Sequence, residues 1–591
     1  MRANDPATLF ARAEQAFLAG RLEAARGDLL AALRLAGEHP AILHLLALLE
    51  KRAGQSEAAR KAFARALRQA PDDPQIRTNH ANLLLSLGDE EAALKELDRA
   101  IDARPGFRDA HVNRAVIRHR SGNATGAWRD IEAFAAAPGA DARILTLAGQ
   151  IRRDLGEFDA AATCFDRALA LDPARATALA GRARVALERG DDDAEARHAT
   201  ARRAAPENIA LRLGEALAAE AGGNAERGIA LLREALHDAP LDTELHVELV
   251  RMASEAGYPH ELDSIAAAAA RPEASLPLHQ AYVTALAQAE RPQDVIEHVD
   301  RLAPAMRADA LLSAQQLAAF DTLDMREHAA PLAERLANGP ATVFVARHAL
   351  RFGDPQRAAS LLEARCLAGT GSVADWAHLG IAWRLLGDYR AAWLFDQPGL
   401  YRWTDLELSA EDLVGLAALL RGLHRTRAHP VDQSLRGGTQ TRGSLFARRE
   451  PALRALAAML DTAIARHMAA LPPADPAHPL LARRDAALRI SGSWSVRLGA
   501  SGFHVSHIHP QGLLSSALYI ALPERIPADD DRAGWLELGR PPAELELDLP
   551  PVATIEPRPG RLALFPSYMF HGTRPFAAGE RLTVAFDVAL R

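Results

Sequence analysis

The sequence predicts an α-helical repeat array over residues 1–400 and an α+β domain with an antiparallel β core over residues 401–591. Three observations support this prediction. A motif with a period of about 34 residues recurs in one phase through the first part of the chain. The composition changes after Gly399, where aromatic residues, His, Gly and Pro become more frequent. From about Leu488 onward, short stretches of alternating apolar and polar residues replace the helical period.

The repeat motif describes two helices joined by a turn. Small residues let the helices approach closely, Gly breaks the chain between them, and Pro ends the second helix. The copies comprise Gly149, Gly156, Phe158, Ala161, Phe165, Ala168 and Pro173; Gly54, Ala59, Phe63, Ala66 and Pro71; Gly88, Ala93, Leu97, Ala100 and Pro105; and Trp376, Leu379, Gly380, Trp383, Gly387, Tyr389 and Ala392. This pattern resembles the tetratricopeptide repeat (TPR), with roughly ten or eleven units that are degenerate over about residues 206–370.

Stacked repeats of this kind bury a shared core and generate a concave surface that can hold a protein or peptide. Asn79 and Asn113 occupy the same position in consecutive repeats. An amide side chain offers both a donor and an acceptor, which matches an extended peptide backbone. We therefore name Asn79 and Asn113 as candidate peptide-binding residues; the alternative is that they are solvated helix residues.

The composition argues against several other classes of protein. The formal net charge of −7 over 591 residues gives no basic footprint for nucleic acid. Cys164 and Cys366 are the only cysteines, which is too few for a disulfide framework or a thiolate metal site. No apolar run is long enough to span a bilayer. We expect a cytoplasmic protein that binds neither nucleic acid nor membrane.

The second region begins with two expected helices, near residues 409–424 and 448–471. Strands are then expected at Arg489–Leu498, Phe503–His509, Ser515–Leu522, Arg561–Phe565 and Arg581–Val588. Gly and Pro separate these strands. Several short strands that close on one another predict a small barrel or jelly roll.

Histidines gather on these strands. If Phe503–His509 is a strand, His507 and His509 share one face, and His504 points to the other. Two imidazoles at this spacing are well placed to bind one metal ion. His571 follows the strand Arg561–Phe565 and is a third candidate ligand.

The ordered motifs resemble the iron(II)/2-oxoglutarate oxygenases, and among them a bacterial group with His-x-His-Pro, Leu-Ser-x-x-x-Tyr, Phe-Pro-Ser, His and Arg in sequence. The matching stretches are His507–Tyr519, Gly560–Thr573 and Arg581–Phe586, with Gln433–Thr441 similar to the leading motif of that group. The resemblance implies a double-stranded β-helix, or jelly roll, as the core of the domain.

The resemblance also implies roles for single residues. His507, His509 and His571 would bind Fe(II) and leave positions for 2-oxoglutarate and O2. Arg581 would bind the far carboxylate of 2-oxoglutarate with its guanidinium fork. Thr583 and Tyr519 would add hydrogen bonds to this co-substrate. The implied reaction is hydroxylation, and the repeats suggest a protein or peptide as the substrate.

One position departs from most of the superfamily, in which Asp or Glu stands in place of His509. A carboxylate cancels part of the iron charge, whereas a neutral imidazole does not. Three interpretations remain open. His509 is a true third ligand; or an acid such as Glu524 or one of Asp529–Asp531 folds into the site; or the metal site is weakened and the domain is not catalytic.

Two other kinds of protein remain as alternatives. The first is a TPR scaffold or adaptor with an inert oxygenase-like barrel. The second is a cupin-type metalloenzyme, which also uses His-x-His on a strand. A cupin usually adds a Glu a few residues downstream, where this chain has Leu513 and Leu514. The ordered His and Arg residues favour an Fe(II)/2-oxoglutarate-dependent dioxygenase.

Overall fold

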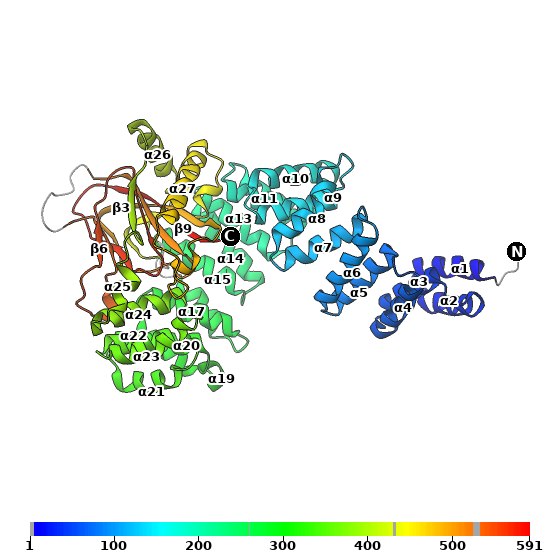
Figure 1. The fold of residues 1–591 in the computed structure, drawn as a ribbon, viewed down its shortest axis with the longest axis horizontal. Coiled ribbons are helices and arrows are strands. Elements are labelled where there is room, and N and C mark those ends of the chain that lie inside the picture. The colour runs from blue at the N-terminus through cyan, green and yellow to red at the C-terminus, as the bar shows by residue number, and fades with distance from the viewer. Residues whose placement is uncertain (1–4, 259–260, 430–432, 524–531) are drawn as a thin grey trace. The chain divides into compact units, whose positions relative to one another are not determined.

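The structure is a computed structural model that describes residues 5–258, 261–429, 433–523 and 532–591 (Figure 1). The chain divides into two compact units, Met1–Val185 and Ala186–Arg591. The first unit is built from helices, and the second combines helices with two antiparallel sheets. A helical array followed by an antiparallel β region is therefore confirmed.

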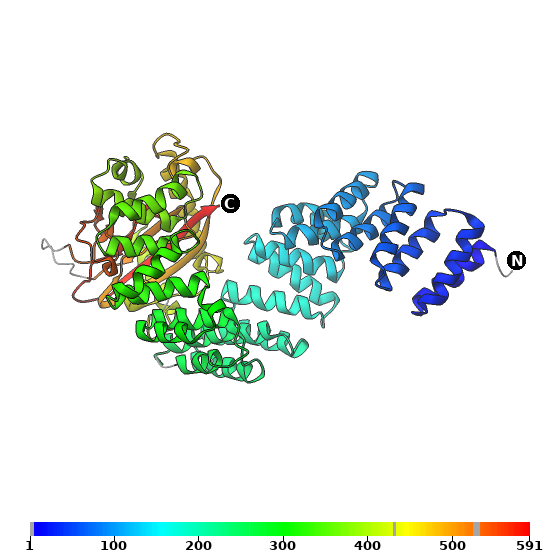
Figure 2. The same cartoon turned by 90° about the horizontal axis from the view of Figure 1, so that it is seen from below.

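The helices of the first unit form antiparallel pairs, each packed against the next (Figure 2). Asp73 begins one of them, because its carboxylate accepts from the backbone N–H groups of Gln75 and Ile76. Gly88, in the turn after this helix, has a φ of +83°, a backbone conformation that residues with a side chain rarely adopt. The helices are α1 (Pro6–Leu18), α2 (Leu22–Ala36), α3 (Pro40–Arg52), α4 (Ser56–Gln69), α5 (Pro74–Ser86), α6 (Glu90–Ala103), α7 (Arg108–Arg120), α8 (Ala124–Ala136), α9 (Ala142–Asp154), α10 (Phe158–Leu171) and α11 (Ala176–Arg189), which runs past the boundary of the unit.

The second unit continues the helical pattern. Within residues 206–370, where degenerate repeats are expected, α16 has 8 residues and α21 contains Pro331. The helices are α12 (Ala194–Ala204), α13 (Ile209–Ala221), α14 (Ala225–Asp238), α15 (Thr243–Glu255), α16 (Leu262–Ala269), α17 (Leu276–Gln288), α18 (Pro292–Arg301), α19 (Pro304–Arg307), α20 (Ala310–Thr322), α21 (Arg326–Leu336), α22 (Thr342–Arg351), α23 (Pro355–Leu367), α24 (Val373–Leu386) and α25 (Arg390–Phe395).

Two sheets follow, with strand orders β1-β7-β4-β9-β3-β2 and β6-β5-β8. Helices α26 (Ala410–Leu423) and α27 (Pro451–Ala469) lie close to the two helices expected. The strands are β1 (Arg402–Asp405), β2 (Leu435–Gln440), β3 (Leu488–His504), β4 (Leu514–Ala521), β5 (Leu536–Leu538), β6 (Ala553–Ile555), β7 (Arg561–Pro566), β8 (His571–Thr573) and β9 (Arg581–Leu590), and the short 3-10 turns are η1 (Leu445–Ala447), η2 (Leu481–Arg483) and η3 (Ala543–Leu545).

One expected strand is wrong. The sequence pattern predicts a strand over Phe503–His509, but β3 ends at His504. The chain then leaves the six-stranded sheet and meets β8 of the smaller one. His507 and His571 form an isolated bridge, with N···O distances of 3.0 and 2.9 Å between their backbones. The strict alternation of side chains therefore fails between His504 and His507.

One hydrophobic cluster joins α22–α25 to the strands and to α27. Trp383 lies at its centre and is fully buried. The hydroxyl of Tyr568 donates to the carbonyl of Leu394 at 2.9 Å, and the ring of Phe570 meets that of His378 edge-on. The last helices of the array and the sheets thus share a core.

Two further expectations concern the cysteines and membrane-spanning helices. Cys164 and Cys366 are both buried and free. Among the described residues, every helix falls short of the length and hydropathy that a membrane span requires.

Close helix packing in the first unit gives a test at Gly149. A Cβ there would lie 2.8 Å from ring atoms of Phe165. Gly149→Ala should lower the free energy of unfolding by about 1–3 kcal/mol because the ring must shift. Gly27 in α2 is the matched control, since a Cβ there meets nothing within 4 Å.

Gly27→Ala should raise stability by roughly 0.5–1 kcal/mol, because Ala is the better helix former. Urea titration followed by circular dichroism measures both variants. Equal stabilisation by the two substitutions would contradict the close packing of Gly149 on Phe165.

Candidate metal centre

Three imidazoles converge between the two sheets. One nitrogen from each of His507, His509 and His571 lies within 4.8 Å of the other two. The ring of His507 is 4.2 Å from that of His571 and 5.1 Å from that of His509. The backbone bridge between His507 and His571 holds two of the rings together, although these residues are 64 positions apart in the chain.

The hydrogen bonds at the outer nitrogens fix the tautomers. Nδ1 of His507 lies 2.9 Å from the carbonyl of Val505, and Nδ1 of His571 lies 3.1 Å from that of Met569. A carbonyl can only accept, so each Nδ1 carries the proton and each Nε2 presents a lone pair. Metal-binding histidines characteristically donate their second nitrogen in this way.

Nδ1 of His509 points at the carboxylate of Asp587, at 2.5 Å from Oδ1. In a neutral ring Nε2 is then an acceptor, and it lies 3.1 Å from Nε2 of His507. Two lone pairs at this distance repel unless a proton or a cation lies between them. The geometry therefore suits a shared cation.

Burial keeps two of these rings neutral. Desolvation, with a further contribution from His509, lowers the pKa of His507 to about 3. Desolvation also lowers the pKa of His571 well below its usual value, with His507 the next contributor. Neutral imidazole is the form that binds a metal, so both rings are ready to do so at neutral pH.

Asp587 is a residue of the site that the sequence analysis missed. It is on β9, and its Oδ1 accepts from both His509 and the hydroxyl of Ser515. Side chains two apart on a strand share a face, so Arg581, Thr583 and Asp587 all point the same way. This alternation along the last strand is the sequence signal that could have identified Asp587.

His504 is a second residue that the prediction misplaced. It lines the same cavity as His507, contrary to the expected opposite face. The hydroxyl of Ser434 lies 3.1 Å from both His504 Nδ1 and His507 Nε2. The early end of β3 explains the error, because the chain turns between the two histidines.

Arg581 lines the same cavity, and Tyr519 lies against it. Arg581 is 3% exposed, and its guanidinium lies 4.9 Å over the ring of Tyr519. It donates to the carbonyl of Gly534 at 2.8 Å. Within the described residues, neither Nε of Arg581 nor the hydroxyl of Tyr519 has a hydrogen-bond partner.

A buried guanidinium without a carboxylate partner is costly. Burial accordingly lowers the pKa of Arg581, and it raises the pKa of Tyr519. Thr583 is buried on the same strand and pairs with Tyr519 across the sheet. These donors fit an anion between Arg581 and the three histidines.

The cavity joins the two groups of residues. It is lined by Gln433, Ser434, Gln440, Trp494, Val496, His504, His507, His509, Ser516, Ala517, Leu536, His571, Gly572, Thr573, Arg581, Thr583 and Ala585. The structure thus brings together the three candidate ligands, Arg581 and Thr583 around one space. Glu524 and Asp529–Asp531, the alternative acids, lie outside the described residues.

The candidate peptide-binding residues belong to the first unit, whereas the lining of the cavity comes from the second. The amide of Asn79 is 2.8 Å from His44 Nε2, and that of Asn113 donates to Asn82 at 2.9 Å. Each contact reaches the first helix of the preceding repeat. These amides therefore form part of a row of polar side chains along α3, α5 and α7.

Comparison with known proteins agrees with both regions. Residues 492–587 match the family described as "Putative 2OG-Fe(II) oxygenase". Residues 44–106, 78–142 and 146–209 match the tetratricopeptide repeat. The chain therefore carries tetratricopeptide repeats and a domain of this oxygenase family. No curated protein matches it.

Solved structures similar to this chain are repeat proteins. A tetratricopeptide repeat protein from Parabacteroides merdae is 20% identical, with a TM-score of 0.32, over 42% of this chain and 98% of its own. The C-terminal part of a repeat protein from Cytophaga hutchinsonii is 16% identical, with a TM-score of 0.33, over 40% of this chain and 97% of its own. PilF from Pseudomonas aeruginosa is 16% identical, with a TM-score of 0.33, over 35% and 95%.

The carboxylate behind His509 gives a test of the metal centre. Asp587→Asn keeps the shape of the side chain but removes its charge. It should weaken Fe(II) binding about 10–100-fold, as loss of an outer partner of a ligating histidine does. Anaerobic titration with Fe(II) measures the dissociation constant. Asp485→Asn, at a side chain that is 79% exposed, is the control.

An Asp587→Asn protein that binds Fe(II) as tightly as the Asp485→Asn control would show that this carboxylate does not support the site.

Proposed function

We propose that the protein is an Fe(II)- and 2-oxoglutarate-dependent dioxygenase that hydroxylates a protein or peptide substrate. One observation carries this proposal. Three imidazoles converge in a cavity, and the buried Arg581, whose Nε has no hydrogen-bond partner among the described residues, lines the same cavity. A metal-chelating dicarboxylate co-substrate matches both. The family match at residues 492–587 supports the same conclusion.

In this proposal His507, His509 and His571 bind the iron through Nε2. Their Nδ1 protons are held by Val505, Asp587 and Met569, respectively, so the rings cannot rotate away. Bound Fe(II), with 2-oxoglutarate and O2, supplies the oxidising chemistry for hydroxylation of a C–H bond.

Arg581 binds the far carboxylate of 2-oxoglutarate. Its position on the ring of Tyr519 and its hydrogen bond to Gly534 fix the guanidinium before the co-substrate arrives. Tyr519 donates its hydroxyl to the same carboxylate, and Thr583 adds a second hydroxyl. Burial of these side chains excludes water and strengthens each of these contacts.

Asp587 supports His509 as the third ligand. An Fe(II) ion held by three neutral imidazoles would have no charged protein ligand, and Asp587 would supply negative charge through its hydrogen bond to Nδ1 of His509. A carboxylate that accepts from the outer nitrogen makes the imidazole a stronger donor to metal. This arrangement favours the ligand role of His509 over the other two interpretations of this position.

The fold and the division of labour are part of the proposal. We assign the double-stranded β-helix, or jelly roll, to the two sheets, because their facing sides enclose the site. Residues 1–400 bind the partner and residues 401–591 carry out the reaction. We place this activity in the cytoplasm, where free thiols such as Cys164 and Cys366 stay reduced.

Two substitutions separate iron binding from co-substrate binding. His571→Ala should abolish Fe(II) binding and the turnover of 2-oxoglutarate to succinate, because it removes a ligand. Arg581→Gln should raise the KM for 2-oxoglutarate about 100-fold and leave Fe(II) affinity nearly unchanged. Anaerobic Fe(II) titration and a succinate assay make these measurements.

Arg497→Gln is the matched control, because Arg497 is on the neighbouring strand and pairs with Glu580 outside the cavity. A wild-type protein without Fe(II) binding would leave a scaffold with an inert barrel. Iron binding without dependence on 2-oxoglutarate would favour a cupin-like enzyme. Equal loss of both functions in Arg581→Gln would remove the assigned role of Arg581.

The repeats give a separate prediction about the substrate. Asn79 and Asn113 lie along one row of first helices. The double substitution Asn79→Ala and Asn113→Ala should reduce hydroxylation of substrates in a peptide library, read by mass spectrometry as the gain of one oxygen. Turnover of 2-oxoglutarate without peptide should not change, because neither residue lines the cavity. Unchanged peptide hydroxylation would exclude these two amides from substrate binding.

A further inference from the structure

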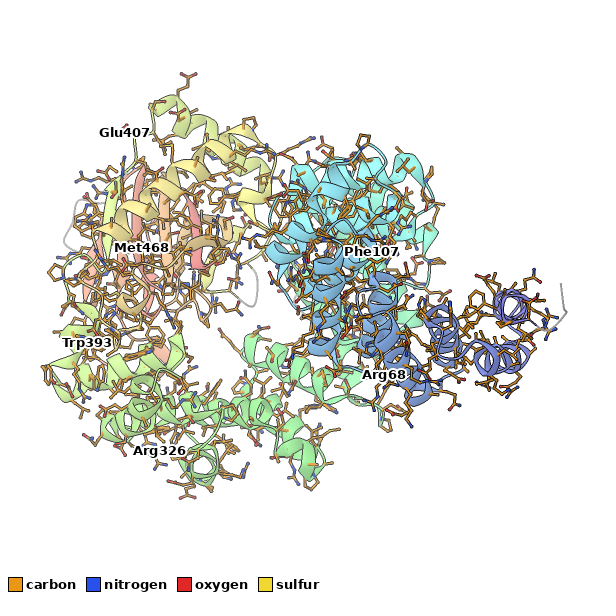
Figure 3. The ribbon with its side chains drawn as sticks, turned by 45° about the vertical axis from the view of Figure 1, so that its right-hand side comes forward. Arg68, Phe107, Arg326, Trp393, Glu407 and Met468 are labelled. Carbon is orange, nitrogen blue, oxygen red and sulfur yellow. The ribbon has the colours of Figure 1, made fainter. Side chains whose placement is uncertain are left out.

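A second cavity lies between α27 and the strands β1 and β7. Arg402 and Thr404 of β1, Arg466 and His467 of α27, and Leu562 and Leu564 of β7 line it. The register sets Arg402 opposite Leu564 and Thr404 opposite Leu562, so these four share one face of the sheet. Helix α27 covers that face, where Figure 3 shows its Met468 in front of the strands.

This face is the one turned away from the metal centre. The ring of Phe565 lies 4.7 Å from that of His571. Successive side chains of a strand point to opposite faces, so Leu564 points away from His571. The sheet therefore separates the two cavities, and they share none of their lining residues.

His467 is the buried polar group of the second cavity. It is 3% exposed, and neither ring nitrogen has a hydrogen-bond partner within the described residues. Desolvation, together with Arg402, lowers its pKa to about 4, so the ring is neutral at physiological pH. A neutral imidazole has one donor and one acceptor, and buried polar groups are almost always paired. The N–H of His467 therefore lacks an acceptor that a ligand in the cavity could supply.

Two arginines supply positive charge at the mouth of the cavity. The side chains of Arg402 and Arg466 are exposed, and no ion pair or hydrogen bond of either is found among the described residues. Two acids are nearby. The carboxylate of Asp405 is already bound by Arg561 at 2.7 Å, and Glu407 is exposed at the rim. The two free guanidiniums thus outweigh the one free carboxylate.

The floor of the cavity is apolar. It is formed by Leu406, Met459, Ala463, Leu562 and Leu564. A purely inorganic anion would leave this surface uncovered. The combination of a cationic mouth, a buried imidazole and an apolar floor matches a charged head on an apolar body.

We propose that this cavity binds a small organic anion, namely a carboxylate carried on an apolar chain. The carboxylate accepts from Arg402, from Arg466 and from the N–H of His467. Its chain lies against Leu562 and Leu564. This site is independent of the proposed oxygenase activity, because it lies on the other face of the sheet.

Hexanoate is the probe for this site, and acetate tests the contribution of the apolar chain. Isothermal titration calorimetry of the full chain, without metal or 2-oxoglutarate, should give saturable binding of hexanoate at one site. Its affinity should exceed that of acetate and of inorganic phosphate about tenfold, because the chain buries apolar surface. Hexanoate that binds no better than acetate or phosphate, or that does not saturate, would overturn the proposal.

Variants locate the binding. The double substitution Arg402→Gln and Arg466→Gln should weaken hexanoate at least about tenfold, since it removes both charged donors. His467→Leu should also weaken it. Arg483→Gln with Arg489→Gln is the matched control, because both are exposed residues of the same region that do not line the cavity.

Arg581→Gln distinguishes this site from the metal cavity. Hexanoate binding that is lost in Arg581→Gln but kept in Arg402→Gln/Arg466→Gln would place the ligand in the oxygenase site and overturn the proposal. The proposal also fails if the control pair weakens binding as much as the Arg402 and Arg466 pair. Circular dichroism confirms that each variant is folded.

Discussion

The backbone bridge between His507 and His571 is the constraint on which the candidate metal centre depends. These two residues exchange both of their N–H···O bonds; His571 begins β8 of the smaller sheet, and His507 follows the end of β3 of the larger one. The bridge brings their rings within 4.2 Å of each other. Each ring is then locked by a carbonyl two residues earlier in the chain. Ligand positions are thus set by main-chain geometry rather than by flexible side chains.

Charge balance is the second requirement of such a centre. Three neutral imidazoles bring no negative charge to a divalent cation, whereas a carboxylate ligand does. Asp587 places a carboxylate behind His509, and Ser515 holds it there. Arg581, which lines the same cavity, has the complementary problem of a buried cation without an anion. The proposed dicarboxylate co-substrate would supply that anion.

The sequence predicted the helical array, the antiparallel region and the three histidines, because each has a local signature. The repeat has a fixed period, and His507 and His509 are two residues apart. Asp587 was missed because its contact with His509 spans 78 residues. Strand alternation places Asp587 on the face of Arg581 and Thr583 but does not report that contact. His504 was misplaced because side chains alternate between the two faces only while a strand continues, and β3 ends at His504. Both failures concern tertiary contacts that periodicity does not encode.

Tertiary contacts also tie the helices of the second unit to its sheets, so the two are not independent bodies. The segment that precedes His571 is held by residues of the helical array. Tyr568 donates to the carbonyl of Leu394, and Phe570 packs on His378. These partners belong to α24 and α25, the last helices of the array. The change from helix to strand near residue 400 is therefore a change of secondary structure within one core. The candidate ligand His571 therefore takes part of its position from the final helices of the array, so these helices contribute to the geometry of the site.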